Sequence, residues 1–156
     1  MMIGIVLFLF LAEHSPRMNE KTIIVCINAP PGLGIGEAVT TIEGVGENIT
    51  KWTERTTIDR DEFNEVFQLL RGIIPTEEDI RNWFDGPEND LGMQGVSWVL
   101  ISVDDDTIVI DYIFNYMEMS ERDLNTIWTT DNFSCEVTLT FAIAHLEYRN
   151  AICKID

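Results

Sequence analysis

The fold is decided by Val96–Met117, which has the sequence VSWVLISVDDDTIVIDYIFNYM. Two apolar runs, Val96–Val103 and Thr107–Met117, flank a polar triplet, and a short polar loop between two such runs is typical of a β-hairpin. In the second run every other position is large and apolar, and these residues are Ile108, Ile110, Tyr112, Phe114 and Tyr116. Because successive side chains of a strand point to opposite faces, the alternation predicts two antiparallel strands with one buried face.

Further strands are expected before and after this hairpin. Lys21–Asn28 and Ala38–Glu43 are rich in β-branched residues, which favours strands. Between them, Pro31–Gly36 has closely spaced glycines, but no helix pattern follows, so we expect a turn rather than a phosphate-binding loop. Large apolar residues alternate with polar residues or alanine from Cys135 to Ala144, which predicts a long final strand.

Three short helices are also expected. Asp59 is suited to cap the first helix and Gly72 to end it, and the apolar stripe between them consists of Phe63, Val66, Phe67 and Leu70. Thr76 begins the second helix, whose first turn is acidic. Ser120 begins the third, which carries Leu124, Ile127 and Trp128.

Together these elements predict an α+β fold. We expect a mainly antiparallel, curved sheet of about five to six strands with two or three short helices packed on one face. No internal repeat or linker divides the chain, so residues 1–156 are expected to form one domain.

The apolar run Ile3–Leu11 is too short to span a bilayer, which needs about 20 residues. No basic residue precedes it, so a buried first strand is favoured over a targeting segment. A third interpretation is that translation starts at Met18 and that residues 1–17 are an extension. We expect no membrane association.

The charge of the chain is strongly one-sided. It contains 27 acidic and 10 basic residues, a formal charge of −17, although 46% of its residues are hydrophobic. Disordered acidic tails lack apolar residues, so this charge must lie on the surface of a folded domain. Such a field speeds encounter with a cationic partner and disfavours direct binding of nucleic acid, which requires a basic patch.

The cysteines predict a reduced protein. The chain has an odd number of cysteines, and none of them has the CxxC spacing, which argues against a disulfide framework or a zinc site. They are Cys26, Cys135 and Cys153. We expect Cys26 and Cys135 to be buried thiols and the protein to be cytoplasmic.

Catalytic and cofactor motifs do not emerge from the sequence. The triplet Asp104–Asp106 lacks the glycine and the final glutamate of a calcium loop, so a solvated turn is expected. His145 lies near Glu147, but a base without an identified nucleophile is only a fragment of an active site. We therefore expect no cofactor, no metal and no enzymatic activity.

The acidic residues fall into two groups that we expect to contact a partner. Residues 54–90 contain 11 acidic and 4 basic residues, and residues 104–123 contain 7 acidic residues against Arg122. An acidic rim around an aromatic anchor suits a cationic protein surface. The predicted partner-binding residues are Asp85, Glu88, Asp90, Trp98, Asp104, Asp105, Asp106, Glu118, Glu121 and Asp123.

A small, very acidic α+β chain with the hairpin SWVLISVDDDTIVI at Ser97–Ile110 resembles the immunity proteins of bacterial toxin systems, including those of contact-dependent growth inhibition. The resemblance implies a protein that binds a cognate toxin, often a basic nuclease, and blocks its active site or substrate groove. Interfaces diverge within that group, so the resemblance assigns no residue.

Two other functions are compatible with the sequence. A phage DNA mimic that inhibits restriction or CRISPR nucleases would need carboxylates spaced along one elongated face. A small-ligand-binding or enzymatic domain would use a curved sheet around a pocket lined by Tyr112, Phe114, Tyr116, Phe141 and His145.

Overall fold

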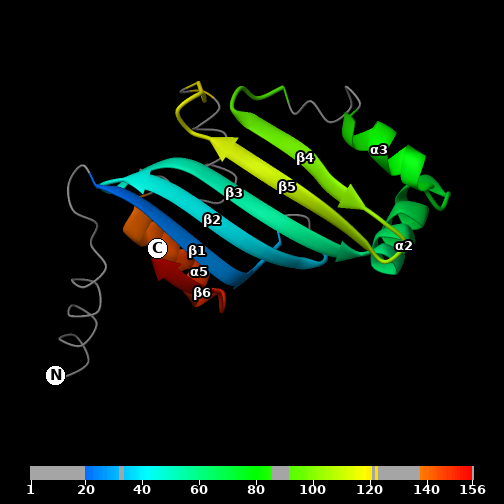
Figure 1. Cartoon of the computed structure of the whole chain (residues 1–156), viewed down its shortest axis with the longest axis horizontal. Helices are drawn as coiled ribbons and strands as arrows, with labels where there is room; N and C mark the ends of the chain where they lie inside the picture. The colour runs from blue at the N-terminus through cyan, green and yellow to red at the C-terminus, as the bar shows by residue number, and fades with distance from the viewer. Residues whose placement is uncertain (1–19, 32–33, 86–91, 121, 123–137, 156) are drawn as a thin grey trace.

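The computed structural model describes residues 20–31, 34–85, 92–120, 122 and 138–155. Its main element is an antiparallel six-stranded sheet with the order β4-β5-β3-β2-β1-β6 (Figure 1). The strands are β1 (Lys21–Ala29), β2 (Glu37–Val45), β3 (Asn48–Asp59), β4 (Val96–Val103), β5 (Thr107–Asn115) and β6 (Ile152–Ile155). The described helices are α2 (Arg60–Arg71), α3 (Glu77–Asp85) and α5 (Leu139–Tyr148). The predicted α+β class with a mainly antiparallel sheet is confirmed.

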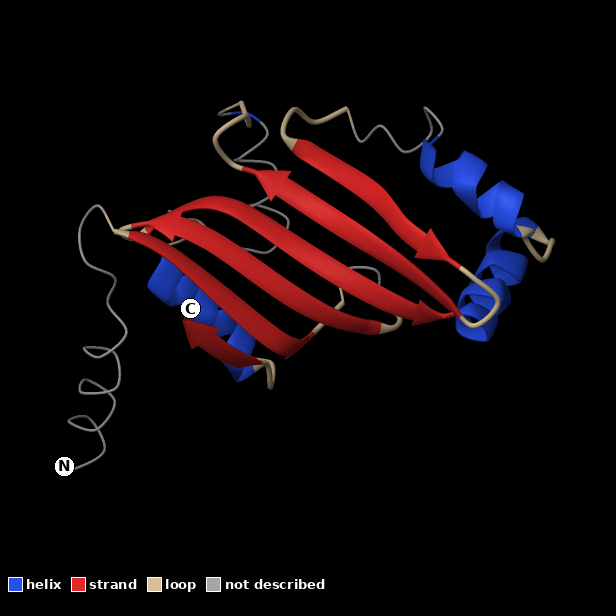
Figure 2. Ribbon diagram, in the orientation of Figure 1, coloured by secondary structure: helices blue, strands red, loops and turns tan. Residues whose placement is uncertain are grey.

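The helices cover one face of the sheet, which we call the inner face. Figure 2 shows α5 behind β1 and β2, whereas α2 and α3 lie at the opposite end of the sheet. Two buried clusters result. The cluster under α5 contains Ile24, Cys26, Ala29, Ala38, Ile42, Leu139, Ala142, Ile143, Leu146 and Ala151. The cluster under α2 and α3 contains Ile58, Phe63, Ile80, Phe84, Val103, Ile108 and Ile110.

The predicted hairpin and the strands around residues 21–28 and 38–43 are all present. After β1, the Gly34 N–H donates to the Pro31 carbonyl at 3.0 Å. The chain then enters β2 rather than a helix, as expected. The predicted strand Ile3–Leu11 and the predicted helix after Ser120 lie outside the described residues, apart from Arg122. No described helix has the length and apolar character needed to cross a bilayer.

The predicted final strand is wrong for residues 139–144, which belong to helix α5. Thr138 caps this helix by accepting a hydrogen bond from the Phe141 N–H at 3.2 Å. The buried positions Leu139, Ala142, Ile143 and Leu146 follow the i, i+3, i+4, i+7 spacing of one helical face. Leu139, Phe141 and Ile143 also alternate with the smaller Thr140, Ala142 and Ala144, but burial against β1 and β2 favours the helical period.

Strand β3 is central in the sheet and was not predicted. It pairs with β2 on one side and β5 on the other, but its inner face includes the polar residues Glu54 and Thr56. Thr56 Oγ1 donates to Glu54 Oε1 at 3.1 Å, so these buried groups satisfy each other in part. A polar inner face hides a buried strand from a hydrophobic pattern.

The prediction of reduced cysteines is wrong for two of the three. Cys26 on β1 is paired directly with Cys153 on β6, and their sulfurs form a disulfide. The two residues are 127 positions apart, so sequence spacing alone could not match them. The bond fastens the short strand β6 to the edge of the sheet.

Candidate docking surface

Three acidic segments meet at the end of the sheet where α2 and α3 lie. Asp59, the last residue of β3, is paired with Thr107, so the start of α2 lies beside the tip of the β4–β5 hairpin. The Arg60 N–H donates to the Asp106 carbonyl at 2.8 Å, and Arg60 Nη2 donates to the Pro75 carbonyl at 3.0 Å. Arg60 therefore holds together the start of α2, the hairpin tip and the segment that leads into α3. We call this region the helical end.

The helical end carries most of the negative charge of the described residues. Residues 59–85 and 104–106 contain eleven carboxylates and three guanidinium groups. The other described residues contain eight carboxylates and six basic groups. The charge is thus concentrated at one end of the sheet, where it produces a local field toward a cationic partner.

Several of these carboxylates also build the local structure. Asp59 caps α2 by accepting hydrogen bonds from the N–H groups of Asp61 and Glu62 at 2.9 and 3.1 Å. Thr76 and Asp79 form a reciprocal cap at the start of α3, because the Asp79 N–H donates to Thr76 Oγ1 while the Asp79 carboxylate accepts from Thr76. The hydrogen bonds from the side chain and then the backbone of Thr76 lower the pKa of Asp79. Both helices therefore present their acidic first turns in a fixed position.

The hairpin tip has one structural and two outward carboxylates. Asp104 accepts hydrogen bonds from the N–H groups of Thr107 and Asp106 at 2.7 and 2.9 Å, which closes the turn. These hydrogen bonds, from Thr107 and then Asp106, lower the pKa of Asp104, with a smaller contribution from the positive charge of Arg60. The exposed side chains of Asp105 and Asp106 are left to face solvent.

The Asp104 carboxylate is expected to titrate at a lower pH in the folded protein than in the unfolded chain. Because the folded-state pKa is depressed, its contribution to stability is complete above the unfolded value of about 3.9 and is lost as the pH falls through the lower folded value. NMR titration of the Asp104 carboxyl carbon, with and without urea, measures both midpoints. Equal midpoints would show that the turn does not hold the charged form.

Next to the acidic segments lies an exposed group of aliphatic side chains, which we call the aliphatic patch. It consists of Leu69, Leu70, Ile73 and Ile74, which are 87%, 74%, 56% and 62% exposed. Leu70 was predicted to belong to a buried stripe, and this is wrong. Phe63 is buried and Val66 and Phe67 are half-buried, but the last turn of α2 is exposed. Four large aliphatic residues within six positions mark an interaction surface more than an ordinary solvated one.

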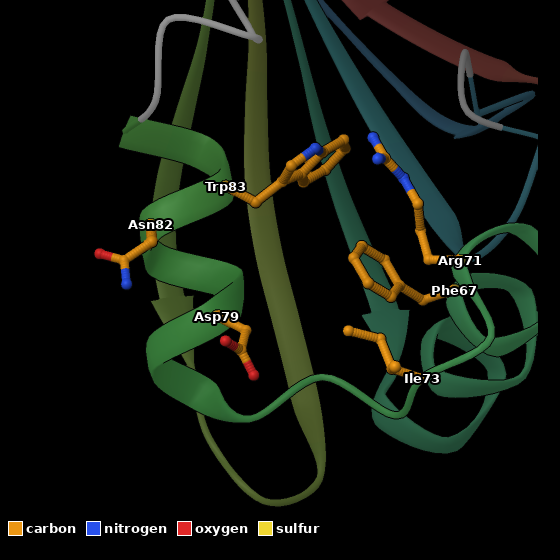
Figure 3. A pocket seen from close by; sticks show the side chains of 6 residues that line it. All are labelled: Phe67, Arg71, Ile73, Asp79, Asn82 and Trp83. Carbon is orange, nitrogen blue, oxygen red and sulfur yellow. The ribbon is translucent and has the colours of Figure 1, made fainter.

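A pocket of about 400 Å³ opens between α2 and α3 beside this patch. It is lined by Phe67, Arg71, Ile73, Asp79, Asn82 and Trp83. Figure 3 shows Phe67, Ile73 and Trp83 pointing toward a common space, with Arg71 along one side and Asn82 at the outer margin. The rings of Phe67 and Trp83 meet edge to face, with centroids 6.2 Å apart. The pocket can receive an apolar side chain of a partner, with one charge of each sign in its wall.

Those predicted partner-binding residues that the structure describes do not all lie on one surface. Asp104, Asp105 and Asp106 lie at the helical end, and Asp85 ends α3. Glu118 lies beyond the far end of β5, where its N–H donates to the Asn115 carbonyl. Glu88, Asp90, Glu121 and Asp123 lie outside the described residues. Trp98 is half-buried on the inner face and stacks on Tyr112, with centroids 4.4 Å apart.

The aromatic residues of the alternative ligand-binding hypothesis fall into two sets. Tyr112, Phe114 and Tyr116 continue the ring contacts of Trp98 along β5, at centroid distances of 4.3 and 6.3 Å. His145 lies on α5 and stacks on Phe141 at 6.4 Å. Burial, and then the charge of Glu54, raise the pKa of Tyr112, so its phenol stays neutral in the folded protein.

Comparison with protein-family models and with curated proteins gives no match. Among solved structures, the chain is similar to one described as "NMR structure of the protein from Streptococcus pneumoniae TIGR4". The TM-score is 0.60 over 89% of this chain and 88% of the other, at 8% sequence identity. At this identity the likeness shows that the two chains share a fold.

Proposed function

We propose that this protein is a non-catalytic binding protein that docks its helical end onto a basic toxin domain, such as a nuclease, and covers the active site or substrate groove of that domain. The observation that supports this proposal most is the coincidence of two features at one end of the sheet. Eleven carboxylates and the exposed aliphatic patch lie within residues 59–85 and 104–106.

The two features have separate physical roles in such a complex. A nuclease is cationic where it holds phosphate, so the carboxylates attract that groove and speed association. The aliphatic patch and the pocket beside it exclude water once the surfaces meet, which slows dissociation. The toxin is then inhibited by occlusion, with one copy bound to each toxin domain and no turnover.

The distribution of charge favours this function over a DNA mimic. A mimic needs carboxylates along an elongated face, at a spacing similar to that of phosphates in a duplex. The sheet face opposite the helices instead carries Lys21, Lys51, Arg55 and Lys154 against Glu37, Glu43 and Asp111. A face with this balance does not imitate a polyanion.

The proposed place of action is the cytoplasm, where an incoming nuclease meets its substrate. Thiol–disulfide exchange requires a thiolate to reach one of the two sulfurs. Cys26 is fully buried, so a thiolate would have to attack the bond at the half-buried Cys153.

Neutralising acids at the helical end is expected to slow association with the proposed basic toxin domain. The variant carries D61N, D105N and D106N, three exposed carboxylates that accept none of the hydrogen bonds described above. We expect the association rate constant at low salt to fall about tenfold, and its salt dependence to weaken, because electrostatic steering is lost. Stopped-flow measurement over a range of salt concentrations tests this.

The matched control carries E20Q, E118Q and E147Q, which remove the same charge from exposed positions away from the helical end. We expect the control to associate at nearly the rate of the unmodified protein. If both variants slowed equally, only the net charge would matter and the assignment of the helical end would be wrong. Salt-independent association of the unmodified protein would oppose the whole proposal.

A further inference from the structure

The sheet face opposite the helices, which we call the outer face, carries an extensive set of aliphatic side chains. One row of side chains crosses all six strands and consists of Val99, Asp111, Arg55, Val39, Ile27 and Ile152. The four aliphatic residues of this row are 39–52% exposed. Figure 1 is viewed onto this face, and no described helix lies in front of it. In the described residues this face therefore lacks the cover that the inner face has.

The outer face differs from the rest of the chain in charge. Outside the helical end, it carries four basic and three acidic residues, on a chain whose formal charge is −17. Lys21 pairs with Glu43 at 3.3 Å. A second copy of the same acidic chain would be repelled by the helical end and would meet the least repulsion here.

The centre of the outer face can be buried without leaving an unpaired charge. Arg55 Nε and Nη2 each donate to the Asp111 carboxylate at 2.7 Å. The Arg55 side chain is still 56% exposed, whereas that of Asp111 is 10% exposed. Burying one partner of an ion pair alone is costly, but a bidentate pair enters an interface with both charges satisfied.

The area of the outer face matches that of a stable dimer. Six strands that are about 4.8 Å apart, with a mean length of about 26 Å, present about 750 Å². A standard protein interface covers about 800 Å² on each partner. A short peptide would occupy only part of this width, whereas a second copy of the sheet would cover it fully.

We infer that two copies of this chain associate through their outer faces, sheet against sheet, around a two-fold axis. A two-fold interface uses the same surface on both partners, and two aligned sheets pack about 10 Å apart with their side chains interleaved. The contact is formed by residues that play no part in the helical end. Both helical ends remain free in the dimer, so this inference is independent of the proposed function.

Sedimentation velocity over a range of protein concentrations tests the inference. The unmodified chain is expected to sediment with twice the chain mass. The variant V39E/I152E places like charges in the interface, and we expect its dimer dissociation constant to rise about a hundredfold or more. The control L69E/L70E makes the same change at the more exposed aliphatic patch and is expected to remain dimeric.

Circular dichroism checks that each variant is folded. If V39E/I152E unfolds, V99K on β4 is used in its place. The inference would be overturned if the unmodified chain were a monomer at every concentration. That outcome includes the case in which residues 1–19 cover the outer face. Dimers that persist in V39E/I152E would overturn it too, as would loss of the dimer in L69E/L70E.

Discussion

Removing the Cys26–Cys153 bond is expected to lower the free energy of unfolding by about 3–5 kcal/mol. The bond closes a loop of 127 positions, so in the chain-entropy account it restricts the unfolded chain strongly. It also holds β6, a strand of only four residues, against β1. Without the bond, β6 would keep only its short ladder and its contacts with α5.

Denaturant unfolding of the oxidised and the reduced protein measures this difference without any substitution. The double variant C26A/C153A should be slightly less stable than the reduced protein, because alanine leaves a small cavity at the buried position 26. The matched control is C135S, which leaves the bond intact. Equal stability of the oxidised and reduced proteins would show that the bond does not restrict the unfolded chain.

The substitution L139A is expected to destabilise the protein by about 3–4 kcal/mol. Leu139 is fully buried at the first turn of α5 and packs over Gly44 of β2. Its backbone N–H donates to the Glu47 carbonyl at 2.9 Å, so the backbone at this position cannot easily shift to fill the space that the substitution creates. The loss is therefore both the transfer free energy and the cost of a cavity.

Thermal and denaturant unfolding of L139A measure this loss. The control is Y148A on the same helix, where the side chain is 87% exposed, and we expect a change within about 0.5 kcal/mol. A similar, small loss in both variants would mean that α5 does not pack on the sheet through Leu139. It would then also remove support for the helical assignment of residues 139–148.

The sequence predicted those parts of the fold in which one pattern dominates. The β4–β5 hairpin combines strict alternation with a short polar turn, and α2 has a cap at Asp59 and a stop at Gly72. Residues 139–144 carry two periods at once, and only their contacts with β1 and β2 decide between strand and helix. Strand β3 was missed because Glu54 and Thr56 occupy buried positions that a hydrophobic pattern assigns to solvent.

The candidate site could be predicted only in part for a similar reason. The grouping of acidic residues in the sequence predicted that Asp104–Asp106 belong to the site. Nothing in the sequence near Arg60 shows that this residue joins the hairpin tip to the start of α2 and to Pro75. The aliphatic patch did leave a signal that was overlooked. Four of the six residues from Leu69 to Ile74 are large and aliphatic, and the helix ends at Gly72 within this run. One face of a helix cannot bury all four.

The place of β6 in the sheet has a consequence for the order of folding. Strands β1 and β2 are neighbours along the chain, whereas β6 is synthesised more than a hundred residues after β1. Contacts between distant segments form late, because the entropy of closing the loop opposes them. During translation β1 therefore emerges with one bare edge that can pair with other nascent chains, and that risk of aggregation ends only when β6 arrives.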